Sequence, residues 1–252
     1  MAVPVFLAMS LLAGACSDDD DGDSASPPET AEATATTAPD PAAGFETEIV
    51  EFSTPDGVAL EGSLFSPADG SGTGIVLAHM RGVDRSTWEP FAETAATEGF
   101  RVLTFDFRGY GGSEGEPDTS LDVDLTAAVE HLRSEGVDGV VVMGASMGGT
   151  TTINVASKLD LDGVVSLSAP AEFQGLPALD VASDVEEPTM FIAAADDQPY
   201  ADAADAMAEL TPDLRRLSTV DGSAHGTNLF AEYEEDMNGW LLGFAADPAG
   251  YS

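Results

Sequence analysis

Two kinds of hydrophobic pattern along the chain predict two kinds of β-strand. Segments 47–53 and 57–67 flank the turn sequence TPDG, so we expect them to pair as an antiparallel hairpin. In the second segment Leu60 and Leu64 alternate with polar residues such as Ser63, which predicts that one face of this strand is open to solvent.

Later apolar runs are nearly continuous, as is typical of parallel strands that are covered on both faces. These runs are residues 74–80, 101–107, 139–145, 163–169 and 189–195, with a final strand expected at 214–220. Helical spacing of Leu121, Leu125, Val129 and Leu132 predicts one helix, and others are expected at 88–98, 147–159, 201–210 and 228–244. The alternation predicts an α/β fold: a three-layer sandwich with a mostly parallel sheet and antiparallel N-terminal strands.

Composition narrows the range of partners. The chain has 252 residues, 43% of them hydrophobic, which suffices for one sizeable core. Its 46 acidic residues against 8 Lys and Arg give a net charge of −38, a surface that repels nucleic acid. Such acidity indicates a halophilic protein, whose self-repulsion is screened by salt, or an acidic proteome.

The N-terminal residues predict export rather than part of the fold. An apolar run over 3–15 is too short to span a bilayer and has the length of a signal-peptide core. The sequence LLAGAC resembles a bacterial lipobox, which implies lipid modification of Cys16, the only cysteine. The alternatives are a secreted protein or a structural cysteine without a partner.

The chain is expected to have three parts. Residues 1–16 are the expected signal and lipobox, and 17–44 form an acidic linker rich in Pro, Thr and Ala that cannot build a core. The folded domain is expected over 45–252. We therefore predict an exported or surface lipoprotein that touches the membrane only through its lipid anchor.

A candidate nucleophile follows the strand 139–145. The sequence Gly144-Ala145-Ser146-Met147-Gly148 fits G-x-S-x-G between a buried strand and a helix. In that motif a strained turn exposes the serine hydroxyl above a helix N-terminus. The alternative is an ordinary glycine-rich turn, so a base for the serine is required.

Three histidines and a pair of aspartates are the candidates for the rest of a catalytic site. His131 lies at the edge of the polar side of its helix and is expected to be solvated, and His79 precedes the serine in the chain. His225, in a loop after the final strand, is the candidate base. Asp196 and Asp197 both follow the strand 189–195, and either could orient the histidine.

Two further loops complete a resemblance to the α/β-hydrolase family over about residues 47–244. LAHMRG (77–82) is similar to the family's HG-x loop, and DFRGYGGSEG (106–115) resembles its D-x-R-G-x-G-x-S loop, which has a structural role. Within this family, the chain resembles the branches of serine esterases, dienelactone-hydrolase-like proteins and acyl-peptidase-like proteins.

The resemblance implies a role for each candidate residue. Ser146 is the expected nucleophile, His225 the base and Asp197 the acid, with Asp196 as runner-up, in the family's chain order. An oxyanion hole is expected from the backbone N–H of Met147 and that of Met80 or Arg81.

A serine nucleophile implies acyl transfer to water, because dienelactone hydrolases use cysteine and dehalogenases use aspartate. A carboxylic ester is the expected substrate, with peptide and thioester bonds as variants. The short segment 171–188 leaves room for only a minimal cap, so we expect an open site for a small-molecule ester or acyl compound.

Other functions stay open on the sequence alone. The chain carries no metal-ligand pattern and no dinucleotide fingerprint, so no metal or other cofactor is expected. An acyltransferase, or a non-catalytic surface lipoprotein that binds a ligand or partner on the same scaffold, remains an alternative. The oligomeric state is not predicted.

Overall fold

The computed structural model describes residues 44–68, 72–117 and 119–252. Cys16, the expected signal and all but the last residue of the expected linker lie outside these ranges, so those expectations stay predictions. Among the described residues, no helix is both long enough and apolar enough to cross a bilayer.

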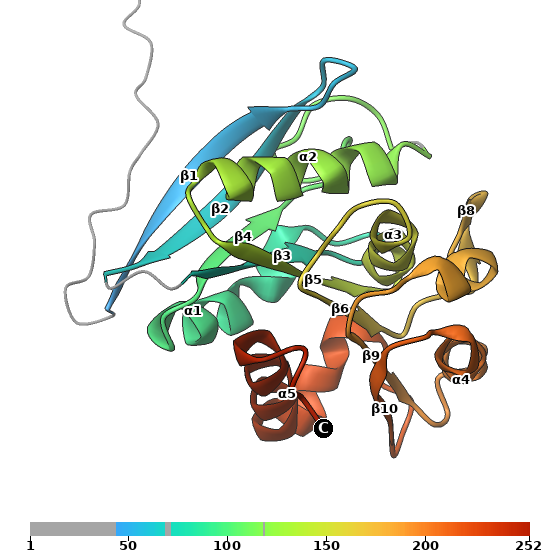
Figure 1. Ribbon diagram of the computed structural model, residues 1–252. Coiled ribbons are helices and arrows are strands. Elements are labelled where there is room, and N and C mark those ends of the chain that lie inside the picture. Colours follow the sequence, from blue (N-terminus) through green and yellow to red (C-terminus); the bar gives the residue numbers. More distant parts are fainter. Residues whose placement is uncertain (1–43, 69–71, 118) are drawn as a thin grey trace, which may run out of the picture. The chain divides into compact units, whose positions relative to one another are not determined.

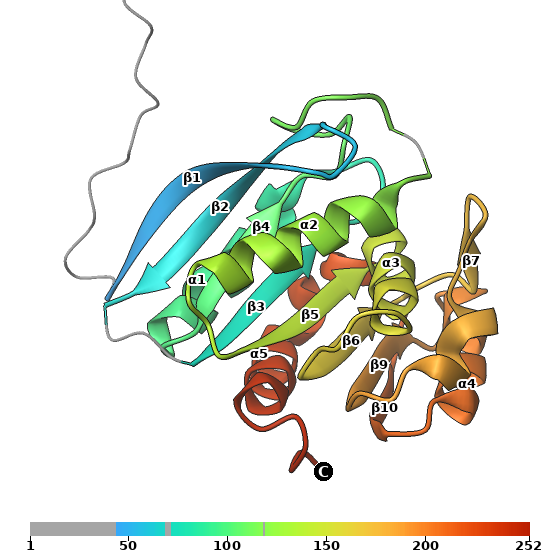
Figure 2. The same cartoon turned by 45° about the horizontal axis from the view of Figure 1, so that its top comes forward.

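Eight strands form one twisted sheet in the order β1-β2-β4-β3-β5-β6-β9-β10 (Figures 1 and 2). The first two strands pair antiparallel, β2 also pairs antiparallel with β4, and every later pair is parallel. The strands are β1 (Phe45–Ser53), β2 (Ala59–Pro67), β3 (Thr73–Ala78), β4 (Arg101–Phe105), β5 (Gly139–Ala145), β6 (Gly163–Leu167), β9 (Thr189–Ala194) and β10 (Leu214–Val220).

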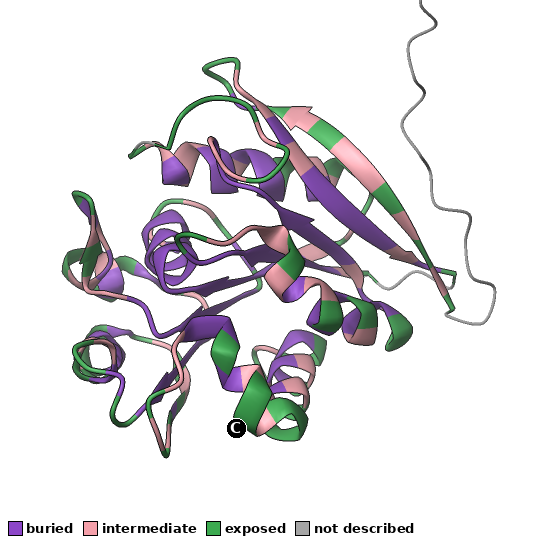
Figure 3. Cartoon of the chain, turned by 180° about the vertical axis from the view of Figure 1, so that it is seen from behind, coloured by how far each residue is buried: buried purple, intermediate pink, exposed green. Residues whose placement is uncertain are grey.

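Helices cover both faces of this sheet, which confirms the predicted α/β-hydrolase sandwich. One face carries α2 (Leu121–Ser134), α3 (Met147–Ala156) and α4 (Tyr200–Leu210), whose apolar residues share one core cluster. The other face carries α1 (Glu89–Thr97) and α5 (Phe230–Ala246), which belong to a second cluster. Side chains along the central strands alternate between the clusters, so these strands are buried throughout (Figure 3).

The segment between β6 and β9 is small in the described structure. It contains the two-residue strands β7 (Glu172–Phe173) and β8 (Leu176–Pro177) and the 3-10 helix η2 (Leu179–Asp184). The hairpin was not predicted, because two residues are too few to produce a periodic signal.

The predicted open face of the second strand needs a correction. Ser63 is buried, with 1% of its surface exposed, because its hydroxyl donates to Glu89 and accepts from the Arg85 side chain. Both partners come from η1 (Arg85–Trp88) and the start of α1, which cover this part of the strand. Alternation along one strand cannot reveal a cover that arrives from elsewhere in the chain.

Candidate active site

Ser146 lies between β5 and α3. Figure 2 shows these two elements meeting at the carboxyl end of the parallel strands. The backbone angles of Ser146 are φ 50° and ψ −113°, a conformation that costs a non-glycine residue about 1–3 kcal/mol. Hydrogen bonds on both sides hold the turn: the Ser146 N–H donates to the Leu167 carbonyl, and Thr150 N–H donates to that of Ser146. The neighbouring strand and the helix therefore keep the serine in its strained position.

Glycines on either side of the serine allow close packing of the backbone. A Cβ atom at Gly144 would lie 2.5 Å from the Thr152 hydroxyl oxygen and closer still to the Gly148 carbonyl. A Cβ atom at Gly148 would lie 2.8 Å from the His79 carbonyl oxygen. The two outer glycines of the G-x-S-x-G sequence are thus required by contacts, not only by turn conformation.

His225 connects Ser146 to Asp197. Its Nε2 lies 2.8 Å from the Ser146 Oγ, and its Nδ1 lies 2.7 Å from Asp197 Oδ2. Because a carboxylate only accepts hydrogen bonds, Nδ1–H donates to Asp197, and Nε2 is left to accept from the serine hydroxyl. This tautomer is the one in which the imidazole can take the serine proton.

The two adjacent aspartates have different environments. Asp197 is buried, with 8% of its surface exposed, and its carboxylate is the one that His225 Nδ1 reaches, whereas Asp196 is exposed. The backbone N–H of Asp196 donates to the Gly222 carbonyl, which joins this loop to the loop that precedes the histidine. Of the two candidates from the sequence, Asp197 is the carboxylate that lies against His225.

Tyr200 also contacts the histidine, a residue that sequence reasoning missed. The centroids of the two rings are 4.3 Å apart, with the ring planes tilted by 52°. Tyr200 begins α4, and its N–H donates to the Asp197 carbonyl over 2.9 Å. The available signal was an aromatic residue three positions after the acid, where the next helix begins.

The three expected oxyanion-hole residues belong to two backbone segments, the start of α3 and the loop that follows β3. Met147 is the first residue of α3, so its N–H belongs to the electropositive end of that helix. Met80 and Arg81 lie in the loop that follows β3. The carbonyls of Ala78 and His79, just before Met80, lie against Gly148, and the Met80 sulfur occupies the space that a side chain at Gly226 would fill.

His79 fixes this segment from within the core. Its Nδ1 lies 2.7 Å from the Met80 carbonyl oxygen, and its Nε2 accepts from the Phe107 N–H over 3.1 Å. Burial lowers the pKa of His79 below 6.5, so the ring stays neutral and can serve as donor at one nitrogen and acceptor at the other. The peptide between Met80 and Arg81 is thereby held in one orientation.

The expected solvation of His131 is wrong. The imidazole stacks on the Phe52 ring with centroids 4.7 Å apart, and burial lowers its pKa below 6.5. Phe52 comes from β1, which lies along α2, so a strand distant in sequence covers what appeared to be the polar edge of the helix. The histidine whose ring reaches Ser146 is His225.

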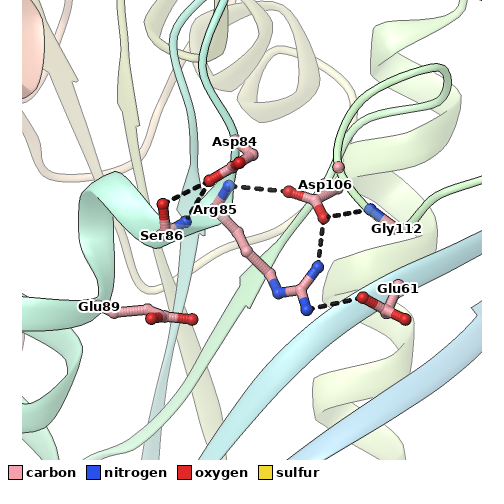
Figure 4. Close-up of a pocket in the computed structure, with 8 residues that line it drawn as sticks. Glu61, Asp84, Arg85, Ser86, Glu89, Asp106 and Gly112 are labelled. Atoms are coloured by element: carbon pink, nitrogen blue, oxygen red, sulfur yellow. Dashed lines mark hydrogen bonds and ion pairs between the residues drawn. The ribbon is translucent and has the colours of Figure 1, made fainter.

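The loop after β4 is held by buried ion pairs, in agreement with its expected structural role. Asp106 is fully buried and accepts from the Arg85 backbone N–H, the Arg85 guanidinium and the Gly112 N–H (Figure 4). The same guanidinium reaches Glu61 over 2.6 Å. This network ties the loops after β3 and β4 to β2.

Two cavities of about 270 Å³ each lie elsewhere in the described domain. The first is polar and surrounds Arg85 (Figure 4); the second lies between α1 and α5, beside Phe91 and Phe230. Neither is lined by Ser146, Asp197 or His225. Within the ranges that the structure describes, no group of three His, Cys, Asp or Glu side chains could hold a metal ion.

Comparison with known proteins gives one family and relatives of several kinds. A family model described as "Alpha/beta hydrolase family" matches residues 75–250. The uncharacterized protein YfhR of Escherichia coli is 30% identical over 143 residues, which are 54% of this chain and 49% of that protein. The thiohydrolase aneE of Aspergillus aculeatus is 36% identical over 116 residues, or 42% of this chain and 36% of its own length.

The chain thus spans half the length, or less, of these two curated relatives. Among solved structures, an esterase of Pyrococcus furiosus is similar with a TM-score of 0.71 and 21% sequence identity. The match covers 81% of this chain and 92% of the esterase chain. At this identity the likeness establishes the fold alone.

Proposed function

Because the chain belongs to the alpha/beta hydrolase family, we propose that it is a serine hydrolase that cleaves carboxylic esters through an acyl-enzyme. The observation that carries the proposal is the pair of hydrogen bonds at His225, to Ser146 and to Asp197. A serine hydroxyl becomes an effective nucleophile only with an adjacent base that is itself oriented by a third group.

In the proposed mechanism, the Ser146 Oγ attacks the ester carbonyl carbon while His225 Nε2 takes the hydroxyl proton. The carbonyl oxygen becomes an oxyanion, bound by the N–H of Met147 and that of Met80 or Arg81. Backbone donors of this kind lower the barrier by about 3–4 kcal/mol each. Asp197 orients the imidazole and stabilises the imidazolium that forms.

Collapse of the intermediate breaks the bond between the carbonyl carbon and the alkoxy oxygen. The His225 imidazolium gives its proton to the leaving alcohol, and the acyl group stays on Ser146. Water then attacks the acyl carbon as His225 takes one of its protons, and the return of that proton to Oγ releases the carboxylic acid.

A small ester is the substrate that this site favours. The described segment between β6 and β9 is a short hairpin and a 3-10 helix rather than a lid domain. Thioesters are a second candidate, favoured by the similarity to a protein named a thiohydrolase.

The test is covalent labelling of the full chain by a fluorophosphonate, read as intact mass. Wild type is expected to gain one adduct, and Ser146→Ala none. The matched control is Ser168→Ala: Ser168 also follows a central strand, is fully buried and has φ 47°, but lacks a histidine partner. Labelling that survives Ser146→Ala, or no labelling of wild type at low and at molar salt, contradicts the proposal.

A positive result leads to a substrate comparison. Nitrophenyl esters of increasing acyl length, matched with thioesters of the same acyl groups, would give kcat/KM for each class. An acceptor alcohol added to the assay separates hydrolysis from acyl transfer, because hydrolysis releases the free acid and transfer forms the ester of that alcohol.

A further inference from the structure

The imidazole of His225 is held in three ways, and the proposed mechanism uses only two of them. Hydrogen bonds at the two nitrogens fix the ring along one axis. The third contact is the ring of Tyr200, whose centroid lies 4.3 Å from that of the imidazole. A cation that lies over the face of an aromatic ring, within about 6 Å of the ring centroid, is attracted by the π electrons.

The position of Tyr200 depends on the backbone of the loop that carries Asp197, between β9 and α4. The Asp197 carbonyl accepts from the N–H groups of Tyr200 and Ala201, over 2.9 and 3.0 Å, so one tight turn joins the acid to the first residue of α4. The Tyr200 hydroxyl makes no hydrogen bond to any other described residue. The aromatic ring, rather than the hydroxyl, is therefore the part of Tyr200 that reaches the histidine.

We propose that Tyr200 is a positioning residue of this site, whose aromatic ring stabilises the His225 imidazolium formed when Ser146 loses its proton. The inference rests on the proposed function for its catalytic consequence but not for the ring contact itself. The imidazole is partly exposed, with 27% of its side-chain surface accessible, so Tyr200 also supplies a face that water would otherwise occupy.

Two substitutions separate the ring from the hydroxyl. Tyr200→Phe keeps the π face and removes the oxygen, whereas Tyr200→Leu keeps apolar bulk and removes the π electrons. We expect Tyr200→Phe to match wild type. We expect Tyr200→Leu to lower kcat about three- to thirtyfold with little change in KM, the range that a cation–π contact supplies.

The decisive readout is titration of the His225 imidazole by NMR in the full chain, which requires no catalysis. The chain has three histidines, and His225→Asn assigns the resonance. In Tyr200→Leu the imidazolium is less stabilised, so the titration of His225 is expected at lower pH than in wild type. The acid limb of the kcat/KM profile is expected to move the same way.

An unchanged titration in Tyr200→Leu, a Tyr200→Phe variant that shifts as far as Tyr200→Leu, or a rise in KM alone overturns the inference. If Tyr200→Leu does not fold, Tyr200→Trp offers a stronger π face and should move the titration to higher pH. A shifted titration in a protein that neither labels nor hydrolyses esters supports the ring contact and refutes the proposed function.

Discussion

Arg108 contacts two aspartates whose environments differ, and removing each in turn tests how burial sets the strength of an ion pair. Asp124, in the first turn of α2, is fully buried and accepts from the Arg108 backbone N–H, Nε and Nη2 over 3.0, 2.9 and 2.7 Å. Asp56 accepts from the same guanidinium over 2.8 Å, but about half of its side-chain surface is exposed, 49%.

The expected effects are unequal. Asp124→Ala removes the hydrogen bonds just described from a buried arginine, and breaking such a pair costs about 3–5 kcal/mol of the free energy of unfolding. With a urea dependence of about 2 kcal/mol per M, the midpoint of unfolding should fall by about 1.5–2.5 M. In Asp56→Ala, water can hydrogen-bond the Arg108 guanidinium where the exposed carboxylate was. The loss of free energy of unfolding should therefore be a small fraction of the loss in Asp124→Ala.

Urea unfolding of the full chain, followed by circular dichroism, measures both variants at low salt and in 1 M NaCl. The Debye length at 1 M is about 3 Å, so the effect of the exposed Asp56 should become clearly smaller there while the Asp124 effect persists. Asp124→Asn, which keeps the shape and one acceptor oxygen, should fall between wild type and Asp124→Ala. Equal shifts for Asp124→Ala and Asp56→Ala, or loss of both effects in salt, would refute the reasoning from burial.

Three further outcomes are expected. Gly148→Ala places a Cβ against the Ala78 and His79 carbonyls, so kcat/KM for an ester should fall about a hundredfold or more with helix content retained; full activity would show that the turn can relax. Burial lowers the pKa of His131 below its ordinary 6.5, because the folded state favours the neutral ring. The contribution of His131 to the free energy of unfolding is therefore complete above that pH and is lost as pH falls below it. His131→Phe, which keeps the stacking on Phe52, should therefore lose less free energy of unfolding than wild type between pH 7.5 and 5.5, and an equal loss would contradict this. Finally, the net charge of −38 predicts a melting temperature that rises with molar salt, so a flat or falling trend would remove the halophilic interpretation.

Local features of the fold and the candidate site could be predicted from residue order. Continuous apolar runs predicted strands β3, β4, β5, β6 and β9, and helical spacing predicted α1 to α5, because side-chain periodicity follows directly from backbone geometry. The turn at Ser146 was predictable for the same reason, since glycine at both flanking positions is a local requirement. Chain order then singled out His225 as the partner to expect.

Other features depended on contacts between distant segments. Sequence left Asp196 and Asp197 as alternatives, and the twist of one loop decided which carboxylate turns inward. The same holds for the Phe52 ring that covers His131 and for the Tyr200 ring beside His225.

The division has a physical basis. Sequence by itself determined the class of fold, the strained serine turn and the order of the candidate residues, because these depend on neighbours within a few positions of the chain. Only the tertiary structure decided which side chains are desolvated and which meet, because burial and hydrogen bonding are properties of elements that pack from different parts of the sequence.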